Sequence, residues 1–115
     1  MNGTEMRQVV LDLGLEDLIP LWEVAGECEV AGPHALADKG DRRARLEALI
    51  ATLVDLFQSR HIRVFVAPWQ IDDPSEAVGH EAEALIRDRR RYFVDREEAE
   101  GLERVYYVNV ENLPY

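Results

Sequence analysis

Residues 41–66, DRRARLEALIATLVDLFQSRHIRVFV, contain two hydrophobic patterns in succession. Over residues 41–60 the apolar positions recur at the spacing of one helical face, at Leu46, Leu49, Ile50, Leu53, Val54 and Phe57. This spacing predicts an amphipathic helix at the centre of the core, with Asp41 as its candidate N-cap. Directly afterwards, β-branched residues alternate with other side chains through Ile62, Arg63, Val64, Phe65 and Val66. We therefore expect a strand here, ended by Pro68.

The first segment before this pair, residues 4–14, can be interpreted in two ways. Helical spacing relates its apolar residues Met6, Val9, Val10 and Leu13. Thr4 would then be the N-cap and Gly14 the stop. Alternation at Val9, Leu11 and Leu13 also suits a strand. We expect a short helix over residues 1–14, with an N-terminal arm as the alternative.

A second helix is predicted over residues 18–30. Its apolar face would consist of Leu18, Leu21, Trp22, Ala25 and Cys28. With Asp17 as N-cap, Pro20 falls at the third helical position, where the missing N–H has no intrahelical partner in any case. The sequence Ala-Gly-Pro at 31–33 would end this helix.

Residues 73–110 complete the predicted fold. Asp73-Pro74-Ser75-Glu76 has the residue order of a helix start and predicts a helix to about residue 91, with an inner face of Val78, Ala82, Leu85 and Ile86. Residues 95–103 are expected to form a loop, and residues 104–110 a strand that pairs antiparallel with 62–66. The predicted fold class is α+β, a helical core with a short antiparallel sheet and an additional helix between the two strands.

Composition limits the classes of function. The chain has 115 residues, 47% of them hydrophobic and 31% charged, which suits one domain over residues 1–115. The net charge of −10 repels phosphate backbones and so disfavours nucleic acid as a partner. No basic leader with an apolar segment and no long apolar stretch is present, so we expect a cytoplasmic protein that does not span a membrane.

Few residues suggest chemistry. Cys28 is the single cysteine, which excludes an internal disulfide, and its place on an apolar helical face predicts a buried structural thiol. The histidines, His34, His61 and His80, fall in different predicted elements, and only His80 has a carboxylate, Glu76, at helical spacing. Glycine-rich phosphate loops and the Gly-x-Ser-x-Gly pattern are both missing. We expect no bound metal, no cofactor and no enzymatic activity.

Four residues are candidates for contact with a partner. Arg42, Arg43 and Arg45 lie at the start of the predicted central helix, where positive charge opposes the helix dipole. They either contact a phosphate group or pair with acidic residues such as Glu29 within the chain. Trp69 lies in a predicted loop, where it either covers the core or serves a partner as an aromatic anchor, whereas Trp22 is predicted to pack in the core.

The segments 15–24, 61–66, 68–69 and 75–77, LEDLIPLWEV, HIRVFV, PW and SEA, resemble those of small bacterial proteins with a winged-helix build and an enlarged wing. In winged helices that bind DNA, a basic recognition helix enters the major groove. The matching helix here, 41–60, has a mixed and partly acidic exposed face. The resemblance therefore implies a non-enzymatic protein-interaction module, accessory or immunity-like, that binds a protein partner or a second copy of the chain. The alternative is a winged-helix DNA-binding transcriptional regulator, and a small enzyme is the third hypothesis.

Overall fold

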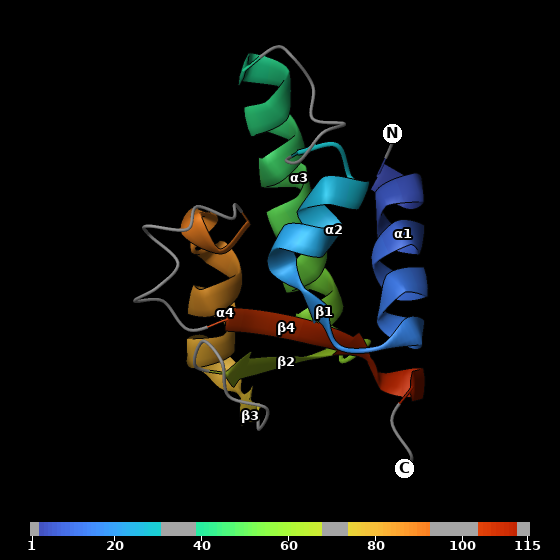
Figure 1. Cartoon of the computed structure of the whole chain (residues 1–115), viewed down its shortest axis with the longest axis vertical. Coiled ribbons are helices and arrows are strands. Elements are labelled where there is room, and N and C mark those ends of the chain that lie inside the picture. Colours follow the sequence, from blue (N-terminus) through green and yellow to red (C-terminus); the bar gives the residue numbers. More distant parts are fainter. Residues whose placement is uncertain (1–2, 31–38, 68–73, 93–103, 113–115) are drawn as a thin grey trace.

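The computed structural model describes residues 3–30, 39–67, 74–92 and 104–112. Its helices are α1 (Gly3–Glu16), α2 (Leu21–Glu27), α3 (Lys39–Gln58) and α4 (Gly79–Arg87), with short 3-10 helices η1 (Arg89–Tyr92) and η2 (Val110–Asn112). Its strands are β1 (Ile19–Pro20), β2 (Ile62–Ala67), β3 (Ser75–Ala77) and β4 (Arg104–Asn109). The predicted α+β class is confirmed (Figure 1).

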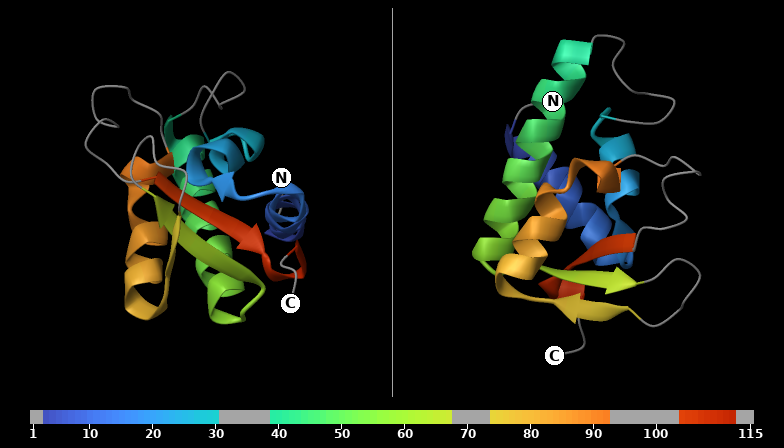
Figure 2. Two further views of the ribbon diagram at one scale, coloured as in Figure 1. Left: turned by 60° about the horizontal axis from the view of Figure 1, so that its bottom comes forward. Right: turned by 90° about the vertical axis from the view of Figure 1, so that its left-hand side faces the viewer.

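The strands form one antiparallel sheet in the order β1-β4-β2-β3. The expected pairing of the two longer strands is confirmed, with Val64 opposite Tyr107 and Phe65 opposite Tyr106. Helices α1, α3 and α4 lie together on one side of this sheet, as the two views of Figure 2 show. Helix α2 continues directly from β1 and packs against η1 and β4. Among the described helices, only α2 reaches the opposite side, which we call the open face, because Trp22 in its first turn lies against Tyr106.

The core lies between the sheet and the helices. Alternate residues of β2 and β4 point into it and are almost fully buried, namely Ile62, Val64, Val105 and Tyr107. Helix α3 contributes the predicted apolar stripe, although it begins at Lys39, which places Asp41 in the first turn. Cys28 is fully buried in the same core, as predicted.

Residues 3–16 form a helix, so the helical interpretation of the first segment is confirmed. The expectation that Gly14 ends this helix was wrong, because Gly14 lies inside it and is buried. A Cβ atom at Gly14 would lie 2.7 Å from the backbone nitrogen of Asn109. Glycine is therefore required where α1 crosses the end of β4.

The predicted helix over residues 18–30 is shorter and starts later. Pro20 has extended dihedral angles (φ −67°, ψ 148°) and belongs to β1, where it pairs with Tyr106 of β4. It therefore precedes α2. Helix α2 ends early because Glu29 adopts a positive φ of 61°, while the Val30 N–H donates to the carbonyl of Ala25 at 2.8 Å. This is a Schellman arrangement, which terminates a helix.

The predicted helix start at residue 73 was also wrong. Residues 75–77 form the edge strand β3 instead, with Ala77 opposite Val64 and buried. Pairing with β2 outweighs the local helix-capping pattern, as tertiary context often does. Helix α4 then begins at Gly79 and ends at Arg87, so Val78 lies before the helix and is 65% exposed, whereas Ala82 and Ile86 are buried as expected. The loop expected over residues 95–103 lies outside the described residues.

Candidate functional site

The open face of the sheet is the candidate functional site. Strand alternation places the side chains of Arg63, Phe65, Arg104 and Tyr106 on this face, because their neighbours Val64 and Val105 point into the core. Phe65 and Tyr106 lie opposite each other on adjacent strands, and both are half-buried. The face therefore carries aromatic and cationic groups on a rigid sheet.

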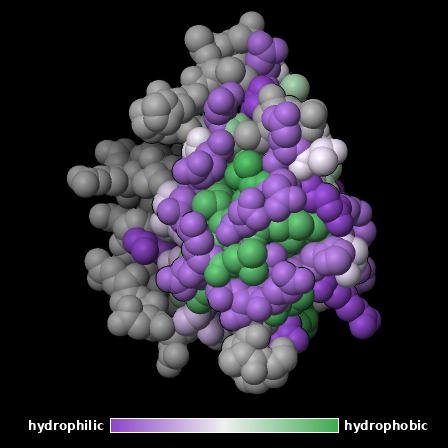
Figure 3. Space-filling view, turned by 90° about the vertical axis from the view of Figure 1, so that its right-hand side faces the viewer, coloured by the Kyte–Doolittle hydropathy of each residue, from purple (hydrophilic) through white to green (hydrophobic). Residues whose placement is uncertain are grey.

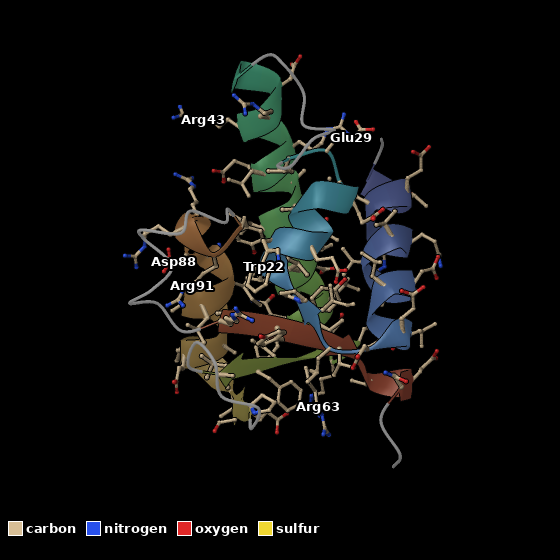
Figure 4. The ribbon with its side chains drawn as sticks, in the orientation of Figure 1. Trp22, Glu29, Arg43, Arg63, Asp88 and Arg91 are labelled. Carbon is tan, nitrogen blue, oxygen red and sulfur yellow. The ribbon has the colours of Figure 1, made fainter. Side chains whose placement is uncertain are left out.

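Trp22 extends this face at the edge formed by β1. Its ring meets the Tyr106 ring edge-on, with 6.3 Å between centroids and 62° between planes. The guanidinium carbon of Arg104 lies 5.3 Å from the centroid of the Trp22 ring, within the range of a cation–π interaction. Trp22 was expected inside the core, but it is half-buried, and Figure 4 shows it on α2, above β4.

A hollow of about 440 Å³ opens on the same face. Its lining consists of Asp17, Leu18, Arg63, Phe65, Glu76, Val108 and Asn112. Arg63 and Glu76, which come from adjacent strands, form an ion pair at 3.6 Å, and each of their side chains is close to half exposed. The hollow is thus lined by both apolar and charged side chains.

Arg43 points away from the other two arginines of this group, because Arg42 and Arg45 are three residues apart and lie on the same side of α3. Arg45 pairs with Glu29 at 3.5 Å, which is the intramolecular pairing considered from the sequence. Arg42 is half-buried, and its Nε is buried without a hydrogen-bond partner, whereas Arg43 is exposed. The three arginines therefore do not form one patch. Trp69 lies outside the described residues.

A second arginine cluster surrounds the end of α4. Asp88 accepts hydrogen bonds from the Arg90 side chain at 3.0 and 2.9 Å and from Arg91 at 3.2 Å, while Glu47 of α3 pairs with Arg89. Hydrogen bonds from Arg90 are the main cause that holds the pKa of Asp88 below its ordinary value. A hollow of about 400 Å³ lies here, lined by Glu47, Ile50, Arg87, Asp88, Arg89 and Arg90. Figure 4 shows Asp88 and Arg91 beside α4, and Arg43 on α3 above them.

Three titratable side chains, those of Cys28, Tyr92 and Tyr107, are buried in the core. Burial raises the pKa of the Cys28 thiol to about 11, so the nucleophilic thiolate is scarce at neutral pH. Burial also raises the pKa of Tyr92 and Tyr107, whose hydroxyls donate to the carbonyls of Ile86 at 2.6 Å and Val10 at 2.8 Å. All three groups are thus part of the buried core.

The remaining candidates for metal binding are dispersed. His61 and His80 are exposed, and His34 lies outside the described residues. The expected helical spacing of His80 and Glu76 was wrong, because Glu76 belongs to β3 and His80 to α4. Within the described ranges, no group of three or more histidine, cysteine, aspartate or glutamate side chains is arranged to hold a metal ion. In the same ranges, no helix has the length and hydrophobicity needed to cross a bilayer.

A smaller apolar area lies on the side of α1. Figure 3 shows hydrophobic side chains gathered in the middle of this side and hydrophilic ones around them. Helix α1 contributes Leu15, which is 42% exposed, and the half-buried Leu11. Arg7 of α1 pairs with Asp55 of α3 at 2.8 Å across this side.

The aromatic residues of the open face were not among the sequence candidates. The alternation in residues 62–66 shows that Arg63 and Phe65 share one face, but not which face the helices leave uncovered. The chain matches no family model, no curated protein and no solved structure. The winged-helix resemblance therefore stays a prediction, and function has to be argued from the chain itself.

Proposed function

We propose that the chain is a non-enzymatic protein-interaction module, accessory or immunity-like, which binds a protein partner through the open face. The observation that carries the proposal is the group of Arg63, Phe65, Arg104 and Tyr106 on the open face, which Trp22 from the first turn of α2 joins at the β1 edge. Tryptophan, tyrosine and arginine are the residue types that contribute most to binding energy at protein interfaces.

The rigidity of this face supports the proposal. Its side chains project from β2 and β4, which are paired along their whole length, and the rings of Trp22 and Tyr106 are in contact. A partner would therefore order few additional side chains on binding, which lowers the entropic cost of association. The net charge of −10 adds long-range attraction for a basic partner.

The test compares two charge insertions on opposite sides of the molecule. Arg63→Asp alters the open face, and Ala51→Asp places an aspartate on the exposed side of α3, pointing away from the core. Each variant and the wild type serve as bait in lysate of the native host, and captured proteins are quantified by mass spectrometry. The proposal expects a protein that wild type and Ala51→Asp retain and Arg63→Asp loses. Equal recovery by all three baits, or no stable partner, would contradict it.

A second copy of the chain is the partner to check first. Analytical ultracentrifugation of wild type and Arg63→Asp separates this case from a foreign partner, because only self-association changes the sedimentation of the purified chain. A dimer that dissociates in Arg63→Asp identifies the second copy as the partner on this face. A dimer that persists in the variant shows that self-association uses another surface.

The second candidate function is the DNA-binding regulator. It is favoured by Arg43 and Arg87, which are exposed and make no ion pair with the described residues. The ion pair of Glu47 and Arg89 brings α3 against η1, so this basic area includes both elements. It ranks second because the exposed residues of α3 include Glu47, Ala48, Ala51 and Asp55. These side chains offer few hydrogen-bond donors for contacts with base edges in the major groove.

Fluorescence anisotropy with a random duplex at low salt tests this candidate. Binding that weakens as salt rises, and that Arg43→Ala with Arg87→Ala reduces about tenfold while Arg7→Ala does not, would support it. Undetectable binding, or binding that does not respond to salt, would exclude it.

A further inference from the structure

The hollow on the open face has a distinct arrangement of apolar and charged groups. Its apolar lining residues are Leu18 and Phe65, which are half-buried, and Val108, which is almost fully buried. Its volume of about 440 Å³ falls in the range of about 300–1,000 Å³ that small ligands occupy. One large apolar side chain of a partner fits such a space.

The charges on the rim do not cancel. Arg63 is engaged with Glu76 at 3.6 Å, so these two charges largely compensate each other. Asp17 accepts a hydrogen bond from the backbone N–H of Leu18 at 2.7 Å and forms no ion pair with any residue in the described ranges. One negative charge therefore remains beside the apolar hollow.

We propose that the hollow receives an apolar side chain from a basic segment of the partner protein, and that a lysine or arginine next to that side chain pairs with Asp17. This inference rests on the proposed function and names the chemistry of the partner. The net charge of −10 favours the same occupant, because it attracts basic segments and repels acidic ones. A second copy of the chain carries the same charge and is repelled at long range.

Three tripeptides serve as probes: acetyl-Lys-Trp-Lys-amide, acetyl-Glu-Trp-Glu-amide and acetyl-Lys-Gly-Lys-amide. Each is titrated into the ¹⁵N-labelled full chain at low salt while amide resonances are followed by NMR. The first probe should shift the amides of Leu18, Phe65 and Val108 in a saturable way. The acidic probe and the probe without an indole ring should each bind at least about fivefold more weakly, because each lacks one half of the proposed recognition.

Asp17→Asn isolates the charge. The asparagine side-chain oxygen still accepts the N–H of Leu18, so the local turn is retained. The variant should bind the Lys-Trp-Lys probe about threefold more weakly, an effect typical of one exposed ion pair. The matched control is Asp12→Asn on α1, where the carboxylate accepts a hydrogen bond from Gln8 at 2.7 Å, outside the hollow. This control should leave the affinity unchanged.

The inference is overturned if the acidic probe binds as tightly as the basic one, if the shifted amides lie elsewhere, or if no probe saturates. These outcomes are separate from failure of the proposed function. Loss of a captured protein in Arg63→Asp together with equal binding of both charged probes would keep the function and reject the basic partner. Binding of the basic probe in the hollow without any partner sensitive to Arg63→Asp would reject the function instead.

Discussion

The two faces of the sheet are built from neighbouring residues with opposite surroundings. Val64 and Tyr107 lie opposite each other and are buried beneath the helices, whereas Phe65 and Tyr106, one position along each strand, lie opposite each other on the open face. The Tyr107 hydroxyl donates to Val10 in α1, while the Tyr106 ring contacts Trp22 at the sheet edge. The same backbone register thus supports a stabilising face and a face available for contact.

This difference shows how closely stability and the proposed function are coupled. A shift of one residue in the pairing of β2 and β4 would exchange the two faces completely. The core contacts of Val64 and Tyr107 therefore also determine that Phe65 and Tyr106 reach solvent. Four predictions test how sharply the two faces differ, in order of decreasing expected effect.

The largest effect is expected from Val64→Asp. This variant replaces a side chain that is 1% exposed by a carboxylate without a partner, so it should lower the free energy of unfolding by about 4 kcal/mol or more. Arg63→Asp, on the adjacent residue of the open face, should cost about 1 kcal/mol or less. Urea denaturation followed by circular dichroism measures both values. Similar losses in the two variants would mean that the open face is as tightly packed as the core.

Gly14→Ala should be the next most destabilising. The new methyl group would lie 2.7 Å from the Asn109 backbone nitrogen, so α1 has to move away from β4, at a net cost of about 1–2 kcal/mol after the gain in helix propensity. Gly3→Ala is the control, since a Cβ there has no atom within 4 Å. The melting temperature should fall in the first variant only. An unchanged value for Gly14→Ala would show that the helix can shift without cost.

Tyr107→Phe should cost about 1 kcal/mol, because it removes the buried hydroxyl that donates to Val10 at 2.8 Å. Tyr106→Phe removes a hydroxyl on the open face and should change stability by less than about 0.5 kcal/mol. Chemical denaturation of both variants gives the comparison. A larger loss for Tyr106→Phe would reverse the assignment of the two faces.

Asp88→Asn should have the smallest effect on stability, visible mainly as a change in the pH dependence at acidic pH. The native pKa of Asp88 lies below its ordinary value, so its ionised form contributes stability that is present above about pH 4 and is lost as pH falls through the native pKa. The variant lacks this contribution of about 0.5 kcal/mol, so its stability should depend less steeply on pH below 4. Thermal melts between about pH 2 and 7 measure the slope. Equal slopes in variant and wild type would contradict the assignment.

The sequence was sufficient to predict those elements whose own hydrophobic pattern identifies them. The apolar stripe in α3 and the alternation at the start of β2 follow from burial of one face, and both predictions are confirmed. The two shortest strands were missed, because β1 and β3 have two and three residues and depend on pairing with neighbours distant in sequence. Their local signals, Pro20 near a helix start and the Ser75-Glu76 capping pattern, indicated helices instead.

The candidate site was predicted less well, for a related reason. Arg42, Arg43 and Arg45 were grouped because they are close in sequence, but a rotation of about 100° per residue directs Arg43 away from Arg42 and Arg45, which share one side of α3. Phe65, Tyr106 and Trp22 come from separate segments that only the sheet brings together. A site of this kind depends on the tertiary structure more than on any local pattern.

The position of β4 has a consequence for synthesis of the protein. This strand comes last of the four along the chain, yet it lies between β1 and β2. During synthesis, neither β1 nor β2 can pair with β4 until residues 104–109 have left the ribosome. Until then, the apolar sides of α1 and α3 lack the complete sheet that covers them in the folded chain. The sheet is therefore expected to form only after β4 has been synthesised, and a chain truncated before residue 104 should be a substrate for chaperones and proteases.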